Sequence, residues 1–316
     1  MSDPFSLVAD IGGTNTRVAL ADGKTIRADS IRRFRNAEFP GLETILRRYL
    51  DDAGVKDCAG ACVAAAGPVR HGVATMTNLS WTIDGAALSR ATGAERVAIL
   101  NDLQAQGHAL GHIAEDKLAR IIDGPVQPED AKLVIGAGTG FNAAPVHDAR
   151  GVRIVAASEC GHINMPIRTE ADLRLARFVE TAHGFPGVED VLAGRGLERL
   201  YAFVRSEAGD PGEMSAAEIM EALAEGDAAA EAAGRLYVRL LGAEIGNLAL
   251  VHLPFGGIFL IGGVARAFQP WLDRFGFADA FRDKGRFAGF MANFAVSVIE
   301  DDYAALTGCA VYLDNL

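Results

Sequence analysis

Two glycine-rich turns, each lying between two apolar runs, are the part of this chain whose residue types are best suited to chemistry. The first turn ends the apolar run 5–11 and the second ends the run 132–137. Because no Cβ is in the way, the backbone N–H groups of a glycine turn can approach an anion closely. Two such turns predict one polyphosphate held from two sides, and the alternative is a pair of ordinary hairpins. The residues of this predicted nucleotide site are Ala9, Asp10, Ile11, Gly12, Gly13, Thr14, Gly138, Thr139 and Gly140.

The residues after each turn argue against two familiar kinds of phosphate site. A dinucleotide-binding fold or a P-loop needs a helix directly after its glycines. Here the first turn leads to the apolar run 16–20 and the hairpin dipeptide Asp22-Gly23. The second leads to the run 141–146, which contains Pro145, and neither turn carries the Gly-Lys-Ser/Thr of a P-loop. Each turn therefore joins two strands.

Aspartates near the predicted strand ends are candidates for the chemistry of phosphoryl transfer. Asp10 ends the first strand, where its carboxylate can hold Mg²⁺ or the waters around it; the alternative is a turn-capping aspartate. Asn101 and Asp102 follow the apolar strand 97–100, at the end of a strand where α/β proteins bind ligands. Asp102 can accept the proton of a substrate hydroxyl, and an aspartate of ordinary pKa, about 3.9, is ionised at neutral pH. Either residue serves equally well as a helix N-cap.

Three further clusters have the composition of ligand sites. Glu159 and His162 lie three positions apart around a glycine, which suits hydrogen bonding to a polyhydroxy ligand better than metal binding. Glu189 stands at the start of a predicted helix, where favourable first-turn charge is a sufficient explanation. Gly262 and Gly263 end the apolar strand 258–261 and open a helix, a geometry that fits the sugar and base of a nucleotide.

Composition indicates an ordinary soluble protein of two domains. Of 316 residues, 50% are hydrophobic and 22% are charged. The net charge of −11 argues against nucleic acid as a partner. The four cysteines are too scattered for a disulfide framework or a zinc site. No signal peptide is evident, and Pro254 interrupts the one membrane-like stretch, 245–265, so we expect a cytoplasmic protein without a membrane partner.

The elements that must position these residues alternate between strand and helix, which predicts an α/β fold. A helix is expected from Leu42 to a stop at Gly54, another over 170–183, and the longest over 228–252. Gly242 and Gly246 in the longest helix indicate close packing against a neighbour. Strands are expected near residues 5–11, 16–21, 26–34, 59–66, 73–77, 97–100, 152–157 and 258–261.

Taken in order, a set of short motifs resembles the bacterial glucokinase family, within the actin/hexokinase/Hsp70 class of ATP-binding folds. The resemblance extends over nearly the whole chain, and the order of the motifs makes it specific. The motifs are Asp10-Ile-Gly-Gly-Thr-Asn15, Met76-Thr-Asn-Leu-Ser-Trp81, Ile99-Leu-Asn-Asp-Leu103, Gly136-Ala-Gly-Thr-Gly140, Glu159-x-Gly-His162, Glu189-x-Val-Leu-Ala-Gly194, Asn247-Leu-Ala-Leu250, Ile261-Gly-Gly263 and Asp283-Lys-Gly-Arg-Phe287.

The resemblance implies a two-domain α/β fold of the actin/hexokinase-like (ribonuclease H-like) type, with a cleft between the domains. The small domain would hold residues 1–103 with about 303–316, and the large domain residues 104–302. The implied enzyme is a cytoplasmic glucokinase of glycolysis, which transfers the γ-phosphoryl group of ATP to the 6-hydroxyl of D-glucose with Mg²⁺ and no zinc. We also expect a homodimer.

The resemblance assigns roles to individual residues as well. Asp102 would be the catalytic base, Asp10 would hold Mg²⁺ through water, and Gly262 and Gly263 would line the adenosine side of the nucleotide site. The implied glucose-binding residues are Asn78, Asn101, Asp102, Glu159, His162 and Glu189.

Departures from the family pattern bear on selectivity. Ser158 and Cys160 stand where the family usually has glycine, and Arg195 where it usually has proline. We expect Cys160 to make the site sensitive to oxidation. A kinase for another hexose, such as fructose, mannose or an N-acetyl sugar, is the first alternative, and a catalytically dead sugar sensor is a weaker one. No role is assigned to the segment 283–287.

Overall fold

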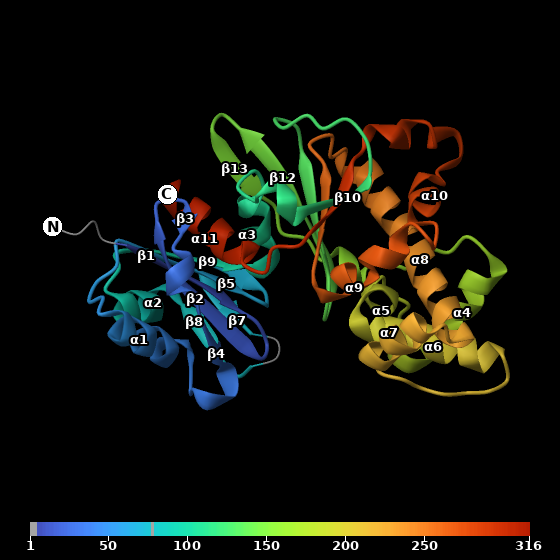
Figure 1. Ribbon diagram of the computed structural model, residues 1–316, viewed down its shortest axis with the longest axis horizontal. Helices are drawn as coiled ribbons and strands as arrows, with labels where there is room; N and C mark the ends of the chain where they lie inside the picture. Colours follow the sequence, from blue (N-terminus) through green and yellow to red (C-terminus); the bar gives the residue numbers. More distant parts are fainter. Residues whose placement is uncertain (1–4, 77–78) are drawn as a thin grey trace. The chain divides into compact units, whose positions relative to one another are not determined.

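The computed structural model describes residues 5–76 and 79–316, and the chain divides into two compact units (Figure 1). Unit 1 comprises residues up to 115 together with 151–155 and 301–316, and unit 2 comprises residues 116–150 and 156–300. The sequence-based boundary lies after residue 103, whereas the structure groups residues 104–115 and 151–155 with unit 1. Both units mix strands and helices, which confirms the predicted α/β class.

Unit 1 is built on a sheet in the order β3-β2-β1-β5-β9, with β4 also paired to β2. The three strands β1, β5 and β9 are parallel, so their carboxyl ends meet at one edge, and β2 returns antiparallel from β1. A single strand predicted over 26–34 is wrong, because a 3₁₀ turn at Ala28–Ser30 separates β3 from β4. The strands are β1 (Ser6–Ile11), β2 (Asn15–Asp22), β3 (Thr25–Ile26), β4 (Arg32–Arg35), β5 (Gly60–Ala65) and β9 (Arg96–Asn101).

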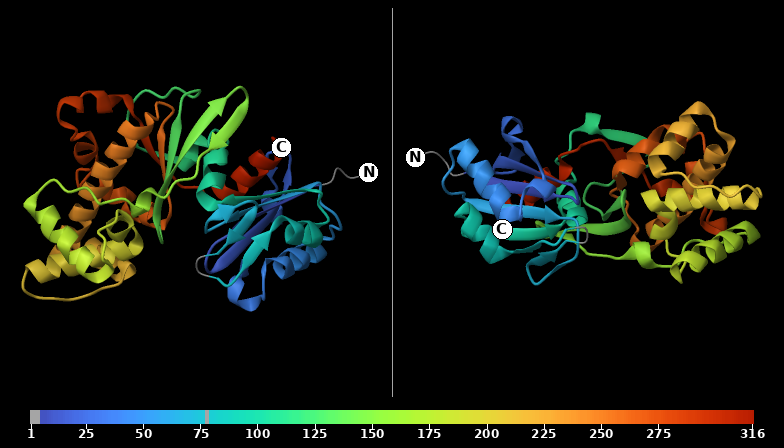
Figure 2. Two further views of the ribbon diagram at one scale, coloured as in Figure 1. Left: turned by 180° about the vertical axis from the view of Figure 1, so that it is seen from behind. Right: turned by 90° about the horizontal axis from the view of Figure 1, so that it is seen from below.

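Helices cover both faces of this sheet. On one face α1 (Leu42–Ala53) and α2 (Gly85–Thr92) bury alternate strand residues, and α1 ends at Gly54 as predicted. On the other face lie α3 (Asp102–Ala109) and α11 (Ala304–Asp314) (Figure 2). The apolar side chains of these two helices pack together on the strands. A second, small sheet consists of β6 (Val69–Arg70), β7 (Val73–Thr75) and β8 (Thr82–Asp84). Strand β13 (Val152–Val155) is not part of that sheet. Its Val155 carbonyl accepts a hydrogen bond from the Gln104 side chain of α3.

Unit 2 has its own sheet, which includes the strand order β10-β15-β14-β11-β12, and one large apolar core. Helix α8 runs through this core, and its glycines lie against α10 as predicted: a Cβ added to Gly242 would be 2.7 Å from the Phe277 carbonyl oxygen. The strands are β10 (Leu118–Ile122), β11 (Lys132–Ala137), β12 (Phe141–Ala149), β14 (Ile258–Ile261) and β15 (Val296–Ile299). The helices are α4 (Glu170–His183), α5 (Glu189–Leu192), α6 (Gly194–Glu207), α7 (Ala216–Glu225), α8 (Ala228–His252), α9 (Gly263–Leu272) and α10 (Phe277–Arg282).

The helices predicted over 170–183 and 228–252 and the strand predicted over 258–261 are confirmed residue for residue. Their ends are set by local chemistry: Thr169 caps α4 and Asp227 caps α8 through side-chain oxygens that accept backbone N–H groups. In the part of the chain that the structure describes, no helix is both long and apolar enough to cross a membrane.

Candidate active site

The first glycine turn joins β1 to β2, and a buried asparagine holds its shape. The Gly12 N–H donates to the Asn15 carbonyl at 3.0 Å, which closes the turn. Asn36, only 2% exposed, donates through Nδ2 to the Gly12 carbonyl at 2.8 Å and accepts the Thr16 hydroxyl at 2.8 Å. Its own N–H donates to the Thr14 carbonyl at 2.9 Å. These bonds leave the turn rigid, as a preformed anion site requires.

Asp10 lies at the carboxyl end of β1, opposite Arg17 of β2 in the antiparallel register. An Arg17 guanidinium nitrogen donates to Asp10 Oδ2 at 3.1 Å. Burial raises the pKa of Asp10 above its ordinary value, and the Arg17 charge only partly opposes that rise. The carboxylate is therefore held in place by one oxygen while Oδ1 makes no hydrogen bond within the described residues.

Asn101 and Asp102 come from the adjacent strand end, where β9 passes into α3. Asn101 is the N-cap of α3: its Oδ1 accepts the Leu103 N–H at 3.1 Å, while its Nδ2 donates to the Gly67 carbonyl at 3.0 Å. Asp102 Oδ1 also accepts the Leu103 N–H, at 2.8 Å. The sequence did not decide which of these two residues caps the helix. In the structure Asn101 is the N-cap, and Asp102 is the first residue of α3.

Asp102 does not have the ordinary pKa assumed from its residue type. Burial, followed by the negative charge of Asp10, raises the pKa of Asp102 to about 6. The cause is topological: β1, β5 and β9 run parallel in register, so the side chains at their carboxyl ends share one edge of the sheet. A base whose pKa lies near the working pH is well matched to proton transfer.

The second glycine turn, Gly138–Gly140, joins β11 to β12 and is tied to α5 and α6. The Gly138 N–H donates to the Gly140 carbonyl at 2.9 Å. Glu189, the first residue of α5, accepts the Phe141 N–H through Oε2 at 2.9 Å. A Cβ on Gly140 would be 2.7 Å from that same oxygen. Glu189 therefore supports the turn directly, in addition to the sugar contact that the family resemblance implies.

Three glycine segments meet behind this turn. The Gly194 N–H donates to the Gly138 carbonyl at 2.9 Å, and a Cβ on Gly138 would be 3.8 Å from the Gly263 nitrogen. Gly262 has φ +104°, and a Cβ there would be 2.3 Å from the Ala137 carbonyl oxygen, so only glycine fits. Gly262 and Gly263 thus adjoin the second turn, and their assignment to the nucleotide stays a prediction. The motif containing Gly194 was noticed in the sequence, but its contact with Gly138 was not foreseen.

Glu159 and His162 lie on a short loop that Asn142 organises. Asn142, on β12, accepts the Cys160 N–H at 3.1 Å and donates to the Ser158 carbonyl at 2.5 Å. Both Glu159 and His162 are exposed, with 3.9 Å between His162 Nε2 and Glu159 Oε2. A Cβ on Gly161 would be 2.0 Å from the Phe141 carbonyl oxygen, so the glycine between them is sterically required. Asn142 Nδ2 also donates to Glu159 Oε2, at 3.4 Å, and both side chains remain accessible to a polar ligand.

Cys160 is a poor candidate for a redox-sensitive residue. Burial raises the pKa of its thiol to about 11, so the thiol is protonated at neutral pH. Because the thiolate is the reactive form, the structure argues against the sensitivity to oxidation that its position suggested.

The segment 283–287, to which the sequence assigned no role, completes a polar cluster on α8. Lys284 Nζ donates to Asn247 Oδ1 and to the Ala243 carbonyl, both at 2.8 Å, and Asn247 donates to Glu244 Oε2 at 3.1 Å. Glu244 is 1% exposed, and burial raises its pKa to about 7. Its charge also contributes to the raised pKa of the Cys160 thiol, which places the cluster near the Glu159 loop.

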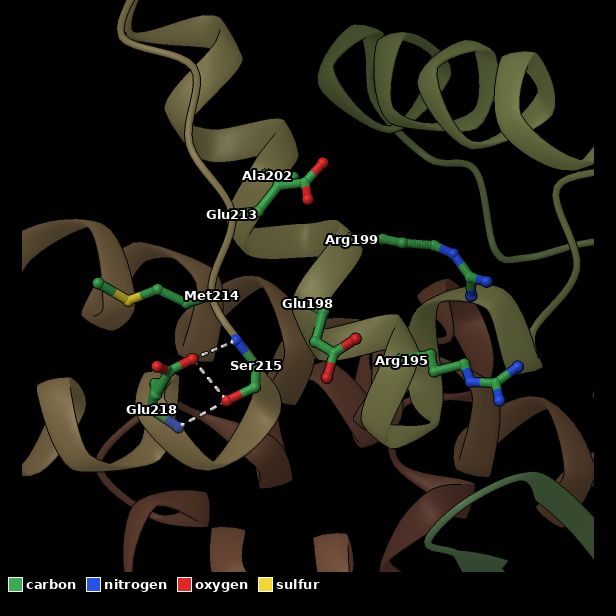
Figure 3. Close-up of a pocket in the computed structure, with 8 residues that line it drawn as sticks. All are labelled: Arg195, Glu198, Arg199, Ala202, Glu213, Met214, Ser215 and Glu218. Atoms are coloured by element: carbon green, nitrogen blue, oxygen red, sulfur yellow. Dashed lines mark hydrogen bonds between the residues drawn. The ribbon is translucent and has the colours of Figure 1, made fainter.

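A surface hollow of about 460 Å³ lies along the start of α6 (Figure 3). Arg199 pairs with Asp190 at 3.2 Å, and Glu198 accepts the Ala216 N–H at 2.9 Å. Arg195, at the family's usual proline position, is exposed at the rim of the hollow. The residues lining the hollow are Arg195, Glu198, Arg199, Ala202, Glu213, Met214, Ser215 and Glu218.

The predicted site residues divide between the two units. Unit 1 carries Asp10, the first glycine turn, Asn101 and Asp102; unit 2 carries the second glycine turn, Glu159, His162, Glu189 and Gly262–Gly263. Asn78 lies outside the described residues. The sequence analysis missed Asn36 and Asn142, which act only through tertiary contacts.

Magnesium, which the family implies, fits the acidic edge of unit 1. The free Oδ1 of Asp10 is the kind of hard oxygen that Mg²⁺ takes, directly or through water, since Mg²⁺ usually has one or two ligands from protein with phosphate and water completing the shell. Within residues 5–76 and 79–316 there is no group of three or more His, Cys, Asp or Glu side chains arranged for a metal. The donor set thus suits an ion that arrives with a nucleotide.

Comparisons with known proteins identify the family. A family model described as Glucokinase matches residues 7–316. A glucokinase of Saccharophagus degradans is 33% identical over 315 residues, which cover 98% of each chain. The solved structure of a glucokinase from an Antarctic psychrotroph superposes with a TM-score of 0.89 at 29% identity, with full coverage of both chains. A glucokinase of Balamuthia mandrillaris, solved in complex with glucose, has the same fold, with a TM-score of 0.82 at 22% identity over 99% of this chain and 94% of that one. From its first glycine turn to its last helix, this chain belongs to the glucokinase family.

Proposed function

We propose that the protein is an ATP-dependent glucokinase, which transfers the γ-phosphoryl group of ATP to the 6-hydroxyl of D-glucose to give glucose 6-phosphate and ADP. The observation that carries this proposal is the family match over residues 7–316. It is supported by the two preformed glycine turns and by Asp102, whose raised pKa suits a general base. The sugar-binding residues of the family are also present.

In this proposal each unit contributes defined groups. The turns Gly12–Thr14 and Gly138–Gly140 bind the phosphates of ATP through the N–H groups that follow Gly12 and Gly138, whose own N–H groups close the turns. Gly262–Gly263 line the adenosine side of the nucleotide. Asn101, Glu159, His162 and Glu189 bind the glucose hydroxyls; Asn78 is assigned with them from the family resemblance alone. Asp102 accepts the proton of the 6-hydroxyl as that oxygen attacks phosphorus, and ADP leaves with the bridging oxygen.

Magnesium would be held by Asp10, through water, and would neutralise charge on the phosphate oxygens. The protein's own residues orient the reactants: the glycine turns align the phosphate chain, and the sugar-binding residues present the 6-hydroxyl to Asp102. Positioning and electrostatic stabilisation account for most of the catalysis in phosphoryl transfer. A role in glycolysis, a cytoplasmic location and a homodimer stay predictions from the family resemblance. The correspondence of units 1 and 2 to functional domains also stays a prediction.

A coupled assay for glucose 6-phosphate tests the proposal directly. With ATP and Mg²⁺ we expect turnover of glucose that exceeds, in kcat/KM, turnover of fructose, mannose and N-acetylglucosamine. EDTA should abolish activity, and Mg²⁺ alone should restore it. A higher kcat/KM for another hexose would replace glucose as the substrate, and no turnover of any sugar would contradict a kinase. Stoichiometric zinc in the active protein would contradict the metal assignment.

A further inference from the structure

Strand β4 places two arginines beside the first glycine turn. In the antiparallel register Arg35 lies opposite Asn15, and Arg33 lies opposite Arg17. Opposed residues of a strand pair share one face of the sheet, so these four side chains form a continuous polar surface. Phe34, between the two arginines, points to the other face and packs against the apolar core of α1.

Arg33 and Arg35 have no acidic partner in the part of the chain that the structure describes. Neither side chain makes a hydrogen bond or an ion pair there, although both residues are exposed and the chain carries 41 acidic residues against 30 basic ones. Arg17 differs, because its guanidinium is bound to Asp10. Like charges directly opposite on adjacent strands, as at Arg17 and Arg33, destabilise a sheet. An anion bound here would relieve that repulsion.

The arginines line a hollow that the glycine turn also lines. This hollow has a volume of about 440 Å³ and is bounded by Thr14, Asn15, Arg33 and Arg35. Thr14 is the last residue of the first glycine turn, whose backbone Asn36 holds rigid. The planar guanidinium of arginine binds phosphate through two parallel hydrogen bonds, which makes a pair of arginines at such a turn a phosphate site.

We propose that Arg33 and Arg35 form, with Thr14 and Asn15, a binding site for a phosphate group that extends the first glycine turn. The chemistry recognised is the phosphate oxyanion. Identifying that anion with a reactant rests on the proposed function, in which the phosphate chain of ATP and the 6-phosphate of the product are the two sources. The site itself does not depend on that identification.

Calorimetric titration of the whole protein tests the site without turnover. Inorganic tripolyphosphate, ADP with Mg²⁺ and glucose 6-phosphate are titrated separately into wild type, Arg33→Gln and Arg35→Gln. Arg32→Gln is the matched control: it removes the same charge from the same strand, but Arg32 is on the other face and donates to the Asp29 and Ile31 carbonyls. Thermal unfolding and circular dichroism establish that each variant is folded.

We expect Arg33→Gln and Arg35→Gln each to weaken tripolyphosphate binding about five- to tenfold, the loss of a charge-assisted contact, while Arg32→Gln changes it less than about twofold. A parallel loss for ADP assigns the site to the nucleotide, and a loss for glucose 6-phosphate assigns it to the product. The proposal is overturned if wild type binds none of the three, or if all three variants weaken binding equally. Arginine-dependent binding without glucose phosphorylation would refute the proposed function and leave the anion site standing.

Discussion

Replacing Asp102 by asparagine should remove turnover and stabilise the unliganded protein. The amide keeps the size of the side chain and the oxygen that accepts the Leu103 N–H, so the start of α3 survives. It cannot accept the proton of the sugar hydroxyl, and we expect kcat to fall by about 10²–10⁴-fold, with glucose affinity changed much less. The two effects have one origin, which is the buried charge of Asp102 beside Asp10.

The stability gain follows from the pKa. The folded-state pKa of Asp102 is about 6 and the ordinary value is 3.8, so the ionised carboxylate opposes folding above about pH 6 and ceases to do so as the pH falls through 6 toward 4. The difference between these two pKa values corresponds to about 3 kcal/mol, and partial exposure of the side chain reduces this to about 1–2 kcal/mol near pH 7.5. Near pH 5 the gain should be about half as large.

Urea unfolding of the apoprotein at several pH values, together with steady-state kinetics, measures both effects. Asp84→Asn is the matched control, because Asp84 caps α2 through the same kind of bond, to the Ala87 N–H at 2.7 Å, away from the predicted site. We expect Asp84→Asn to leave turnover unchanged and not to raise the free energy of unfolding. If Asp102→Asn keeps near-normal kcat, Asp102 is not the base. If the variant is less stable than wild type at about pH 7.5, the raised pKa is refuted.

Two perturbations away from the substrates test the packing that supports the site. Gly308→Ala would place a Cβ 1.7 Å from the Ala105 carbonyl oxygen of α3. We expect urea unfolding to show that the free energy of unfolding falls by more than about 2 kcal/mol, whereas the same change in a helix usually raises it by about 1 kcal/mol. An unchanged unfolding midpoint would contradict the contact. Lys284→Met leaves Glu244 buried without its cation. Because the pKa of Glu244 is about 7, we expect a loss of about 2–3 kcal/mol above pH 8 and a smaller one near pH 6, with Arg286→Met as the exposed control; a loss independent of pH would count against the pair.

The helices were predictable from sequence because their signals are local. The longest helix begins at an Asp227 cap and ends two residues before Pro254, which cannot continue a helix, and both signals are visible in the sequence. The strand predicted over 26–34 failed for an equally physical reason. The Ser30 hydroxyl accepts the Leu20 N–H at 2.9 Å and donates to the Arg27 carbonyl at 2.6 Å. At this point the Ser30 side chain therefore takes the place of the backbone hydrogen bonds that would pair two strands.

The candidate site was predictable only as far as its residues lie in recognisable motifs. Asn36 and Asn142 were missed because each acts on a turn far away in sequence, and neither stands in a pattern of its own. The pKa of Asp102 depends on Asp10, which a separate strand brings to the same edge. Arg33 and Arg35 were unremarkable in the sequence, because only the strand register with β2 places them next to the glycine turn.

The place of α11 in unit 1 has a consequence for how the protein is made. This helix is the last in sequence order, yet it packs on α3 and covers one apolar face of the first sheet, including Val8 and Cys62. On the ribosome that face stays open while all of unit 2 is synthesised, so the sheet that is translated first is the one completed last. Domains usually fold in the order in which they emerge. Here the sheet of unit 1 is completed only when α11 has emerged, and its apolar face stays exposed to solvent until then.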